Sequence, residues 1–164
     1  RAASSPLERG GWEADPSQSA PEVVDAVVRD LEVAADSARL FLQLLSLPTP
    51  TKAQLLKWNG WTAAAWTRAA KPLIDAGLIV QGQRARSGRD LFLSGPWAEL
   101  SAPDLPVETW KLPLYEAEVG ADGSVRKPID RLVPLLPLHQ LFAAAWQRWQ
   151  TADRPGFEQV PGRR

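Results

Sequence analysis

The strongest constraint on the fold is a pair of helix-start signals on either side of a helix-breaking Asn-Gly pair. Thr51 is followed at capping-box spacing by Gln54, so the sequence predicts a short helix from Thr51 to Trp58. The Asn-Gly pair after Trp58 ends that helix, and Thr62 is placed to cap a second one. We therefore expect two short helices joined by a tight turn in the middle of the chain.

A hairpin is expected directly after the second helix. The helical pattern runs toward Ala76, and Gly77 ends it. Two short apolar strands, 78–80 and 91–93, flank the loop 81–90, whose glycines suit a turn. The inner side of the second helix carries Trp66, Ala69, Ala70 and Leu73, and the outer side carries Thr67, Arg68 and Lys71. The predicted order is helix, turn, helix, hairpin.

The N-terminal part of the chain divides at residue 20. Residues 1–20 lack periodic apolar positions and are rich in Ser, Ala, Pro and Gly, so we expect a flexible linker there. Apolar residues then recur at helical spacing over 21–47, and the pattern leaves open whether this stretch is one helix or two. Pro48 and Pro50 stop the helical pattern.

The segment after residue 95 is interrupted by prolines. Residues 110–119 partly alternate, which predicts a strand at a sheet edge, and 125–133 is expected to pair with it across a turn at 120–123. Pro137 introduces a final helix that runs to about Thr151. Its apolar stripe consists of Leu138, Leu141, Phe142, Ala145 and Trp149. Helices mixed with short strands predict an α+β fold.

Composition and hydropathy exclude several classes of protein. The 164 residues include no Cys, no Met and one His, which excludes disulfide scaffolds, cysteine nucleophiles and multi-histidine metal centres. His139 has no nucleophile or metal ligand at a spacing that would support a catalytic role. Glu116 and Glu118 are better explained as alternating residues on the solvated face of a strand than as a catalytic pair. We expect no enzyme, no catalytic residue, no metal and no cofactor. No apolar run approaches the roughly 18 residues that cross a bilayer, so we expect a cytoplasmic protein with no membrane partner.

The charge of the chain is balanced in total but unevenly distributed. Basic and acidic residues number 19 each. Residues 51–94 hold seven basic residues against two acidic ones, a net charge of +5, so the rest of the chain carries −5. The positive region coincides with the two predicted helices and the hairpin, which favours binding to a polyanion such as DNA.

The order of these elements resembles the winged helix-turn-helix domains of bacterial transcription regulators of the MarR and ArsR kind. The matching parts are the apolar helix Ala38–Leu47, the Thr-led helix Thr51–Trp58, the turn Asn59–Thr62, the recognition helix Ala63–Ala76 with Gly77-Leu78-Ile79 after it, and the basic wing Arg84–Arg89. The resemblance covers about residues 36–95. It implies an α+β fold with a winged helix-turn-helix domain over 21–96. A C-terminal extension of short strands and a terminal helix over 97–152 would follow, with a flexible tail over 153–164.

The resemblance also implies binding to double-stranded DNA, as a module of a bacterial regulatory or multidomain protein. The outer side of the recognition helix begins with alanines rather than with the Arg, Asn or Gln that pair with base edges. Binding is therefore expected to depend mainly on phosphate contacts. The predicted nucleic-acid-binding residues are Thr62, Thr67, Arg68 and Lys71 on the helix and Arg84, Arg86 and Arg89 on the wing.

A protein-protein interaction module within a larger assembly is the alternative function for the same fold. Ala63–Ala65 and the helix-disturbing Pro72 favour it. That alternative expects the C-terminal part to cover the recognition helix, whereas DNA binding expects a contiguous positive surface on the helix and wing. Most of the eight Trp residues are interpreted as packing residues, and Trp12, Trp97 and Trp110 are open to a role as anchors for neighbouring domains of a longer chain.

The apolar stripe of the last helix leaves the oligomeric state open. Together with the helix that begins at Pro21, it is suited to form a homodimer. Packing of the same stripe onto the core of its own chain is equally compatible with the pattern.

Overall fold

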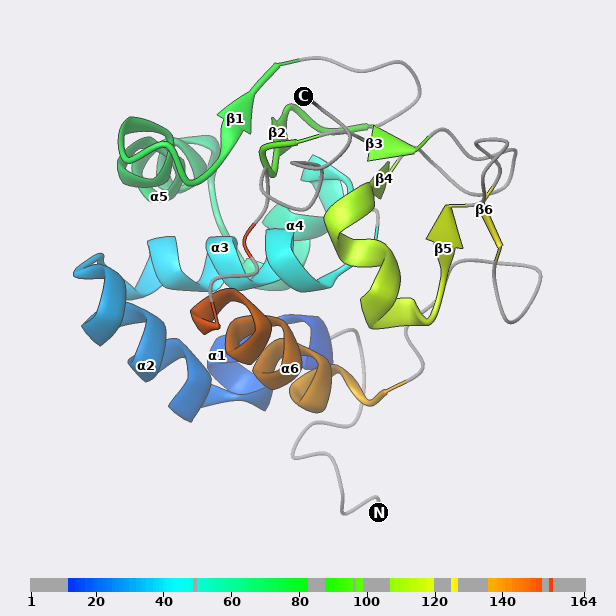
Figure 1. The fold of residues 1–164 in the computed structure, drawn as a ribbon. Coiled ribbons are helices and arrows are strands. Elements are labelled where there is room, and N and C mark those ends of the chain that lie inside the picture. Colours follow the sequence, from blue (N-terminus) through cyan, green and yellow to red (C-terminus); the bar gives the residue numbers. More distant parts are fainter. Residues whose placement is uncertain are drawn as a thin grey trace.

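The fold is described from a computed structural model of the chain (Figure 1). The described residues are 12–48, 50–82, 88–95, 97–98, 107–119, 125–126, 136–151 and 154. Several predictions lie outside them, namely those on residues 1–11, on Arg84 and Arg86 of the wing, on the turn at 120–123, on residues 127–133 and on all of the tail except Arg154.

The described residues form helices and short antiparallel strands, which confirms the α+β class in its coarse form. The helices are η1 (Trp12–Ala14), α1 (Pro16–Ser19), α2 (Pro21–Leu31), α3 (Ala35–Ser46), α4 (Lys52–Asn59), α5 (Ala63–Asp75), η2 (Thr109–Tyr115) and α6 (Leu138–Gln150). The strands are β1 (Val80–Gln81), β2 (Leu91–Phe92), β3 (Trp97–Ala98), β4 (Val107–Glu108), β5 (Glu118–Val119) and β6 (Val125–Arg126). They pair as β1 with β2, β3 with β4 and β5 with β6, and Val80 lies opposite Phe92 in the first pair.

Helix α3 is the centre of the core. It lies between α5 on one side and α2 and α6 on the other, and it contacts all three (Figure 1). Its fully buried apolar residues are Ala38, Leu40, Phe41, Leu42, Leu44 and Leu45. Because the residues from Ser37 to Ser46 are buried on all sides of α3, apart from the half-buried Arg39, the helix can support others on several sides at once.

The two capped helices in the middle of the chain have the predicted form. Thr51 Oγ1 accepts a hydrogen bond from Gln54 N (3.1 Å), and Gln54 Oε1 accepts one from Thr51 N (3.0 Å), which completes the capping box of α4. Gly60 ends α4 with φ +70°, a conformation that glycine adopts without steric cost. Thr62 then caps α5 by accepting a hydrogen bond from Ala65 N (3.1 Å). These local signals confirm the predicted helix, turn and helix.

The stretch that the pattern left undivided over 21–47 forms two helices. Glu32 ends α2 in the left-handed conformation, with φ +57°. Its backbone N–H donates to the carbonyl of Val28 (2.9 Å) as a C-cap. Helix α3 then begins at Ala35.

The N-terminal segment differs from its prediction. The flexible linker predicted over 1–20 is wrong for residues 12–20, which include the two helices η1 and α1. Asp15 is almost fully buried and pairs with Arg39 of α3 at 2.9 Å, and Ala14 is only 3% exposed. The segment is ordered because its polar groups find partners on α3, and apolar periodicity does not detect such partners.

The strand predicted over 110–119 is wrong for most of its length. Residues Thr109–Tyr115 form the helix η2, and only Glu118–Val119 is a strand, which pairs with β6 as expected. Pro113 has no N–H for a strand ladder, and its fixed φ suits a helical turn. Glu116 ends η2 in the left-handed conformation (φ +58°), so it does not share a strand face with Glu118.

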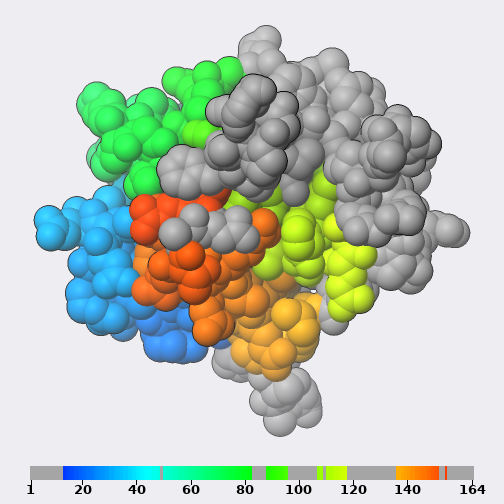
Figure 2. Space-filling view, in the orientation of Figure 1, coloured from blue at the N-terminus to red at the C-terminus, as the bar shows by residue number. Residues whose placement is uncertain are grey.

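Helix α6 belongs to the same core as the helices of the predicted 21–96 domain. Phe142, Trp146 and Trp149 are buried, and the Trp149 ring meets the Phe41 ring edge-on at 5.7 Å. In Figure 2 the orange surface of α6 adjoins the blue surface of the N-terminal helices and the yellow-green surface of η2. The apolar stripe that left a homodimer open is therefore covered within the chain.

Candidate nucleic-acid interface

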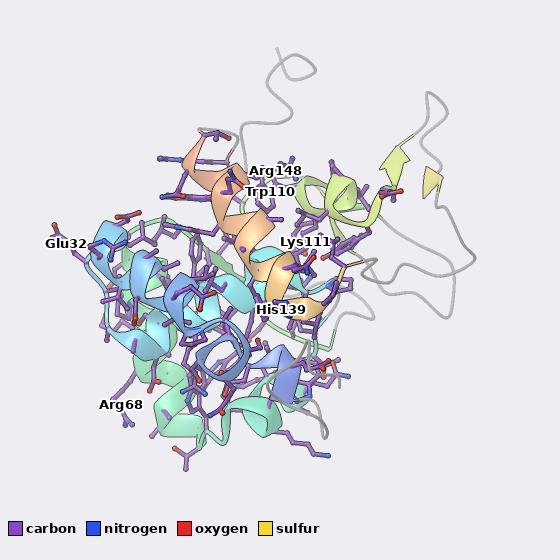
Figure 3. All side chains as sticks on the ribbon, turned by 90° about the horizontal axis from the view of Figure 1, so that it is seen from below. Glu32, Arg68, Trp110, Lys111, His139 and Arg148 are labelled. Carbon is purple, nitrogen blue, oxygen red and sulfur yellow. The ribbon has the colours of Figure 1, made fainter. Side chains whose placement is uncertain are left out.

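The outer face of α5 is exposed, as the predicted interface requires. Thr62, Thr67, Arg68 and Lys71 are all exposed, while Trp66 on the inner side is only 4% exposed. The Arg68 side chain points away from the body of the molecule (Figure 3). Thr67, Arg68 and Lys71 therefore share the solvent-facing side of α5, opposite Trp66, and Thr62 is exposed at its N-cap.

The first turn of α5 presents only small side chains to solvent. Ala63 and Ala64 are exposed, and Thr62 hydrogen-bonds to Ala65 N, one of the amides of this turn. A helix N-terminus carries partial positive charge from its unpaired N–H groups. With no long side chains in the way, the backbone of a partner can approach this end of the helix closely.

The basic side chains of α4 and α5 differ in whether a neighbouring side chain binds them. Lys71 Nζ forms an ion pair with Asp75 at 3.1 Å, and both side chains are largely exposed. Lys52 Nζ lies 5.3 Å from the centre of the Trp66 ring, which is a cation–π distance. Within the described residues, Lys57 and Arg68 are exposed and have no ion pair with an acidic side chain. These two cations are the ones most available to an anionic partner.

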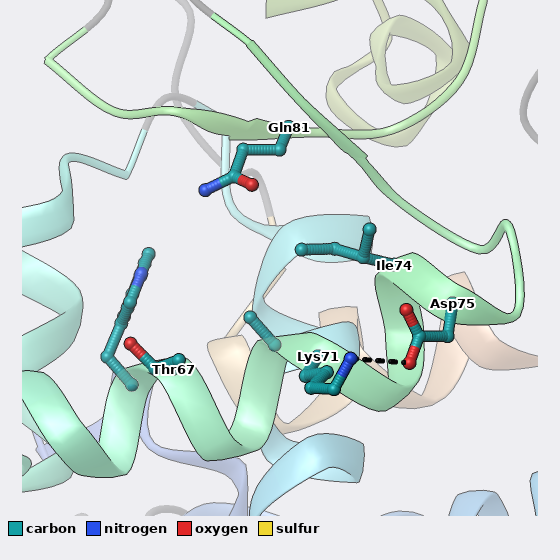
Figure 4. A pocket seen from close by; sticks show the side chains of 7 residues that line it. Thr67, Lys71, Ile74, Asp75 and Gln81 are labelled. Atoms are coloured by element: carbon teal, nitrogen blue, oxygen red, sulfur yellow. Dashed lines mark hydrogen bonds and ion pairs between the residues drawn. The ribbon is translucent and has the colours of Figure 1, made fainter.

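A pocket of about 250 Å³ lies between α5 and β1 (Figure 4). It is lined by Trp66, Thr67, Ala70, Lys71, Ile74, Asp75 and Gln81. The Gln81 side chain reaches from the strand toward the helix, and the Lys71–Asp75 ion pair forms part of the helix side. Two of the predicted binding residues, Thr67 and Lys71, thus line a hollow between the helix and the hairpin.

The structure corrects one of the residues predicted for the wing. Arg84 and Arg86 lie outside the described residues, so their assignment stays a prediction. Arg89 was predicted as an exposed cation of the wing, and that prediction is wrong because its side chain is 1% exposed. Its guanidinium donates to both carboxylate oxygens of Glu108, from Nη2 to Oε1 at 2.6 Å and from Nη1 to Oε2 at 3.0 Å. Arg89 therefore anchors the base of the hairpin inside the protein.

Glu108 joins Arg89 and Lys111 in a buried charged cluster. Lys111 Nζ lies 3.3 Å from Glu108 Oε1, and both side chains have 0% exposure. Lys111 Nζ also donates to the carbonyl of Leu47 at 2.6 Å and to that of Pro48 at 3.2 Å, just beyond the end of α3. The cluster thus links the hairpin, β4, η2 and the C-terminal end of α3.

The burial of this cluster changes how its groups ionise. Burial raises the pKa of Glu108, but the charges of Lys111 and Arg89 and hydrogen bonds from Arg89 and Leu93 N–H outweigh it, so that the pKa falls to about 2. Burial lowers the pKa of Lys111 to about 7, although the Glu108 carboxylate opposes this change. Burial also raises the pKa of Tyr115, whose hydroxyl donates to the carbonyl of Ser46.

Glu108, Lys111 and Tyr115 were not singled out from the sequence. Lys111 stands in the largely apolar stretch Trp110–Leu114, and a lone lysine among apolar residues is the one sequence signal of a buried cation. Trp110, which was open to a role as an external anchor, is fully buried, with the Arg148 guanidinium 4.2 Å from its ring centre. Trp12 and Trp97 have side chains outside the described set.

The other groups considered from the sequence form no site among the described residues. His139 is half-buried near the start of α6, and Glu116 is exposed at the end of η2. Across the described ranges, no three His, Cys, Asp or Glu residues are grouped so that they could hold a metal ion. None of the helices in those ranges combines the length and apolar character needed to span a bilayer.

Comparison of the chain with protein-family models, with curated proteins and with solved structures gave no match.

Proposed function

We propose that this chain is a winged helix-turn-helix module that binds double-stranded DNA. In this proposal α3, α4 and α5 are the three core helices, α5 is the recognition helix, and β1 and β2 form the base of the wing. The module would act without catalysis, in the cytoplasm, as part of a bacterial regulatory or multidomain protein. The observation that carries the proposal is the exposure of Thr67, Arg68 and Lys71 on one face of α5, with Thr62 exposed at its N-cap.

The chemistry of that face favours phosphate contacts. Arg68 and Lys71 are one helical turn apart and are long enough to reach phosphates on either side of a groove. Ala63 and Ala64 at the start of the helix have no hydrogen-bonding side chain with which to read base edges. Arg84 and Arg86 would add phosphate contacts from the wing. Affinity would therefore depend strongly on salt and weakly on sequence.

The alternative, a winged-helix module that binds another protein, has its own support. The exposed surface of α5 includes Ala63, Ala64 and Pro72, which is a small and largely uncharged surface. The protein-interaction alternative predicts that the C-terminal part covers the recognition helix, but Thr62, Thr67, Arg68 and Lys71 are exposed. For that reason we place DNA binding first.

Fluorescence anisotropy with a labelled DNA duplex at several salt concentrations tests the proposal. We expect wild-type binding to weaken with salt, with a slope of roughly −0.9 in log affinity per phosphate contact. The double variant R68A/K71A should bind more weakly and lose roughly 1 to 2 units of that slope. R29A is the matched control, because Arg29 is an exposed cation on α2 with a side-chain exposure of 71%.

Two results would count against DNA binding. One is the absence of any binding by the folded wild-type protein at low salt. The other is a double variant whose affinity and slope equal those of R29A. Either result would favour the protein-interaction module.

A further inference from the structure

A buried glutamine on α3 connects three separate parts of the chain. Gln43 has 0% exposure although its neighbours on the helix are leucines. Its Nε2 donates to Asn59 Oδ1 at 2.8 Å and to the carbonyl of Ala14 at 2.9 Å, and Asn59 Nδ2 returns a hydrogen bond to Gln43 Oε1 at 2.8 Å. A polar group in a core is costly unless it is satisfied, and here each bond leads to the helix turn or to the N-terminal segment.

Arg39, one helical turn before Gln43, makes a second connection between the same parts. It donates from Nε to Asp15 Oδ1 at 3.2 Å and from Nη2 to Asp15 Oδ2 at 2.9 Å, which is a two-pronged ion pair. Nη2 also donates to the carbonyl of Asn59 at 3.3 Å, and the guanidinium lies 5.2 Å from the centre of the Trp61 ring. Arg39 and Asp15 have side-chain exposures of only 14% and 4%, so solvent screens this pair weakly.

The turn between α4 and α5 is closed by two local hydrogen bonds, from Gly60 N to the carbonyl of Lys57 (3.3 Å) and from Trp61 N to that of Leu56 (3.0 Å), and Gln43 and Arg39 tie it to α3. Gly60 is exposed and left-handed, and a Cβ atom at this position would meet nothing within 4 Å. Asn59 and Trp61 on either side of it are the residues that Gln43 and Arg39 hold. Because α5 starts three residues after Gly60, the direction of α5 depends on how this turn is held.

We propose that residues Trp12–Ala20, which we call the N-terminal brace, fix the turn at Asn59–Trp61 through Asp15, Arg39 and Gln43, and thereby set the orientation of the exposed face of α5. Displacing the brace loosens the turn and weakens whatever binds that face. The part of this proposal that concerns DNA rests on the function proposed above, and the part that concerns the turn does not.

The test compares D15N with D36N by amide hydrogen exchange. Asparagine caps a helix as well as aspartate does, so D15N keeps an oxygen for the cap of α1. It removes the negative charge and replaces Oδ2, which accepts from Arg39 Nη2, with an amide group that cannot accept a hydrogen bond. Asp36 pairs with the same guanidinium at 3.0 Å but is 50% exposed, and its side chain hydrogen-bonds to no residue of the brace or the turn, which makes D36N a matched control. N59A removes the Asn59 amide that exchanges two hydrogen bonds with Gln43, so it is a second variant with the same expected effect.

We expect exchange at the Gly60 and Trp61 amides to rise about tenfold in D15N and N59A and less than twofold in D36N. The rise should be confined to the brace and the turn, whereas a purely global loss of stability would raise exchange throughout α3 and α5 as well. Equal exchange in D15N and D36N, or a uniform rise along the chain, would overturn the brace.

DNA binding separates the two proposals. If wild-type protein binds duplex DNA, D15N should bind several-fold more weakly with an unchanged salt slope, because no phosphate contact is lost. Tighter binding with a steeper slope in D15N would contradict a positioning role, because it would mean that the released Arg39 contacts the phosphates. If the exchange result is as expected but wild-type protein does not bind DNA, the proposed role of the brace is supported and the proposed DNA binding is wrong.

Discussion

Arg89 and Glu108 form a two-pronged ion pair that solvent does not reach. Their side chains are 1% and 0% exposed, and the shorter of the two N···O distances is 2.6 Å. The pair joins the residue at the base of the hairpin to β4, across 19 positions of the sequence. The position of the hairpin next to α5 therefore depends on a charge pair that also includes Lys111.

Replacing Arg89 should destabilise the fold far more than replacing an exposed arginine. R89A leaves the buried Glu108 carboxylate without its main partner, and we expect a loss of about 3 kcal/mol or more in the free energy of unfolding. R68A removes an exposed side chain and should change it by less than about 0.5 kcal/mol. Urea denaturation of both variants measures the difference, and equal losses would mean that the pair is not buried as described.

Lys111 should make the protein more stable as pH rises above neutrality. Its pKa is about 7 in the folded protein and 10.5 in its ordinary state, so the unfolded chain binds more protons between these values and stability rises with pH. Glu108 stays ionised in this range because its pKa is about 2, and Tyr115 stays protonated because its pKa is raised.

The variant K111M isolates this effect. Urea unfolding from pH 6.5 to 9.5 should show a rise in stability for the wild type that is smaller in K111M, since methionine has no proton to lose. If the two proteins have the same pH dependence, Lys111 does not titrate as its burial implies.

The cap of α5 should contribute measurably to stability. T62A removes the hydroxyl that accepts a hydrogen bond from Ala65 N, and we expect a loss of about 1 kcal/mol in unfolding free energy. Thr67 is the matched control, because its hydroxyl is exposed and donates only to the carbonyl of Ala63 in its own helix. T67A should change stability by less than about 0.5 kcal/mol. Equal effects would show that the cap at Thr62 adds nothing.

Releasing Lys71 from Asp75 should strengthen DNA binding. In D75N the ammonium no longer has its ion-pair partner at 3.1 Å and is available to a phosphate, so affinity at low salt should rise about twofold to fivefold. D25N removes an exposed acid from α2 and controls for the change in net charge. If D25N gains as much affinity for DNA as D75N does, the change in net charge explains the effect and Lys71 has no specific role in it.

Local signals in the sequence were sufficient to predict α4, the turn after it, α5 and α6. The capping box at Thr51, the turn at Gly60 and the helix after Pro137 each depend on residues within a few positions of one another, and all three are present in the structure. The placement of Trp66 on the inner face of α5 follows from helical periodicity in the same way.

The features that were missed depend on partners far away in the sequence. Asp15 is ordered by Arg39, and Arg89 is buried because Glu108 is there to receive it. Nothing near Arg89 in the sequence distinguishes it from an exposed wing arginine, since its burial depends on a carboxylate in a different strand pair. The partial alternation over 110–119 indicated a strand, whereas the helical turn that suits Pro113 is what forms.

The central claim is that the exposed face of α5 binds duplex DNA, and amide chemical-shift mapping during a titration with a short duplex tests it most directly. We expect the largest shifts at Thr62, Thr67, Arg68 and Lys71, and little change along α2 and in the second half of α6. Shifts confined to α2 or α6, or no shifts at all at low salt, would contradict the claim.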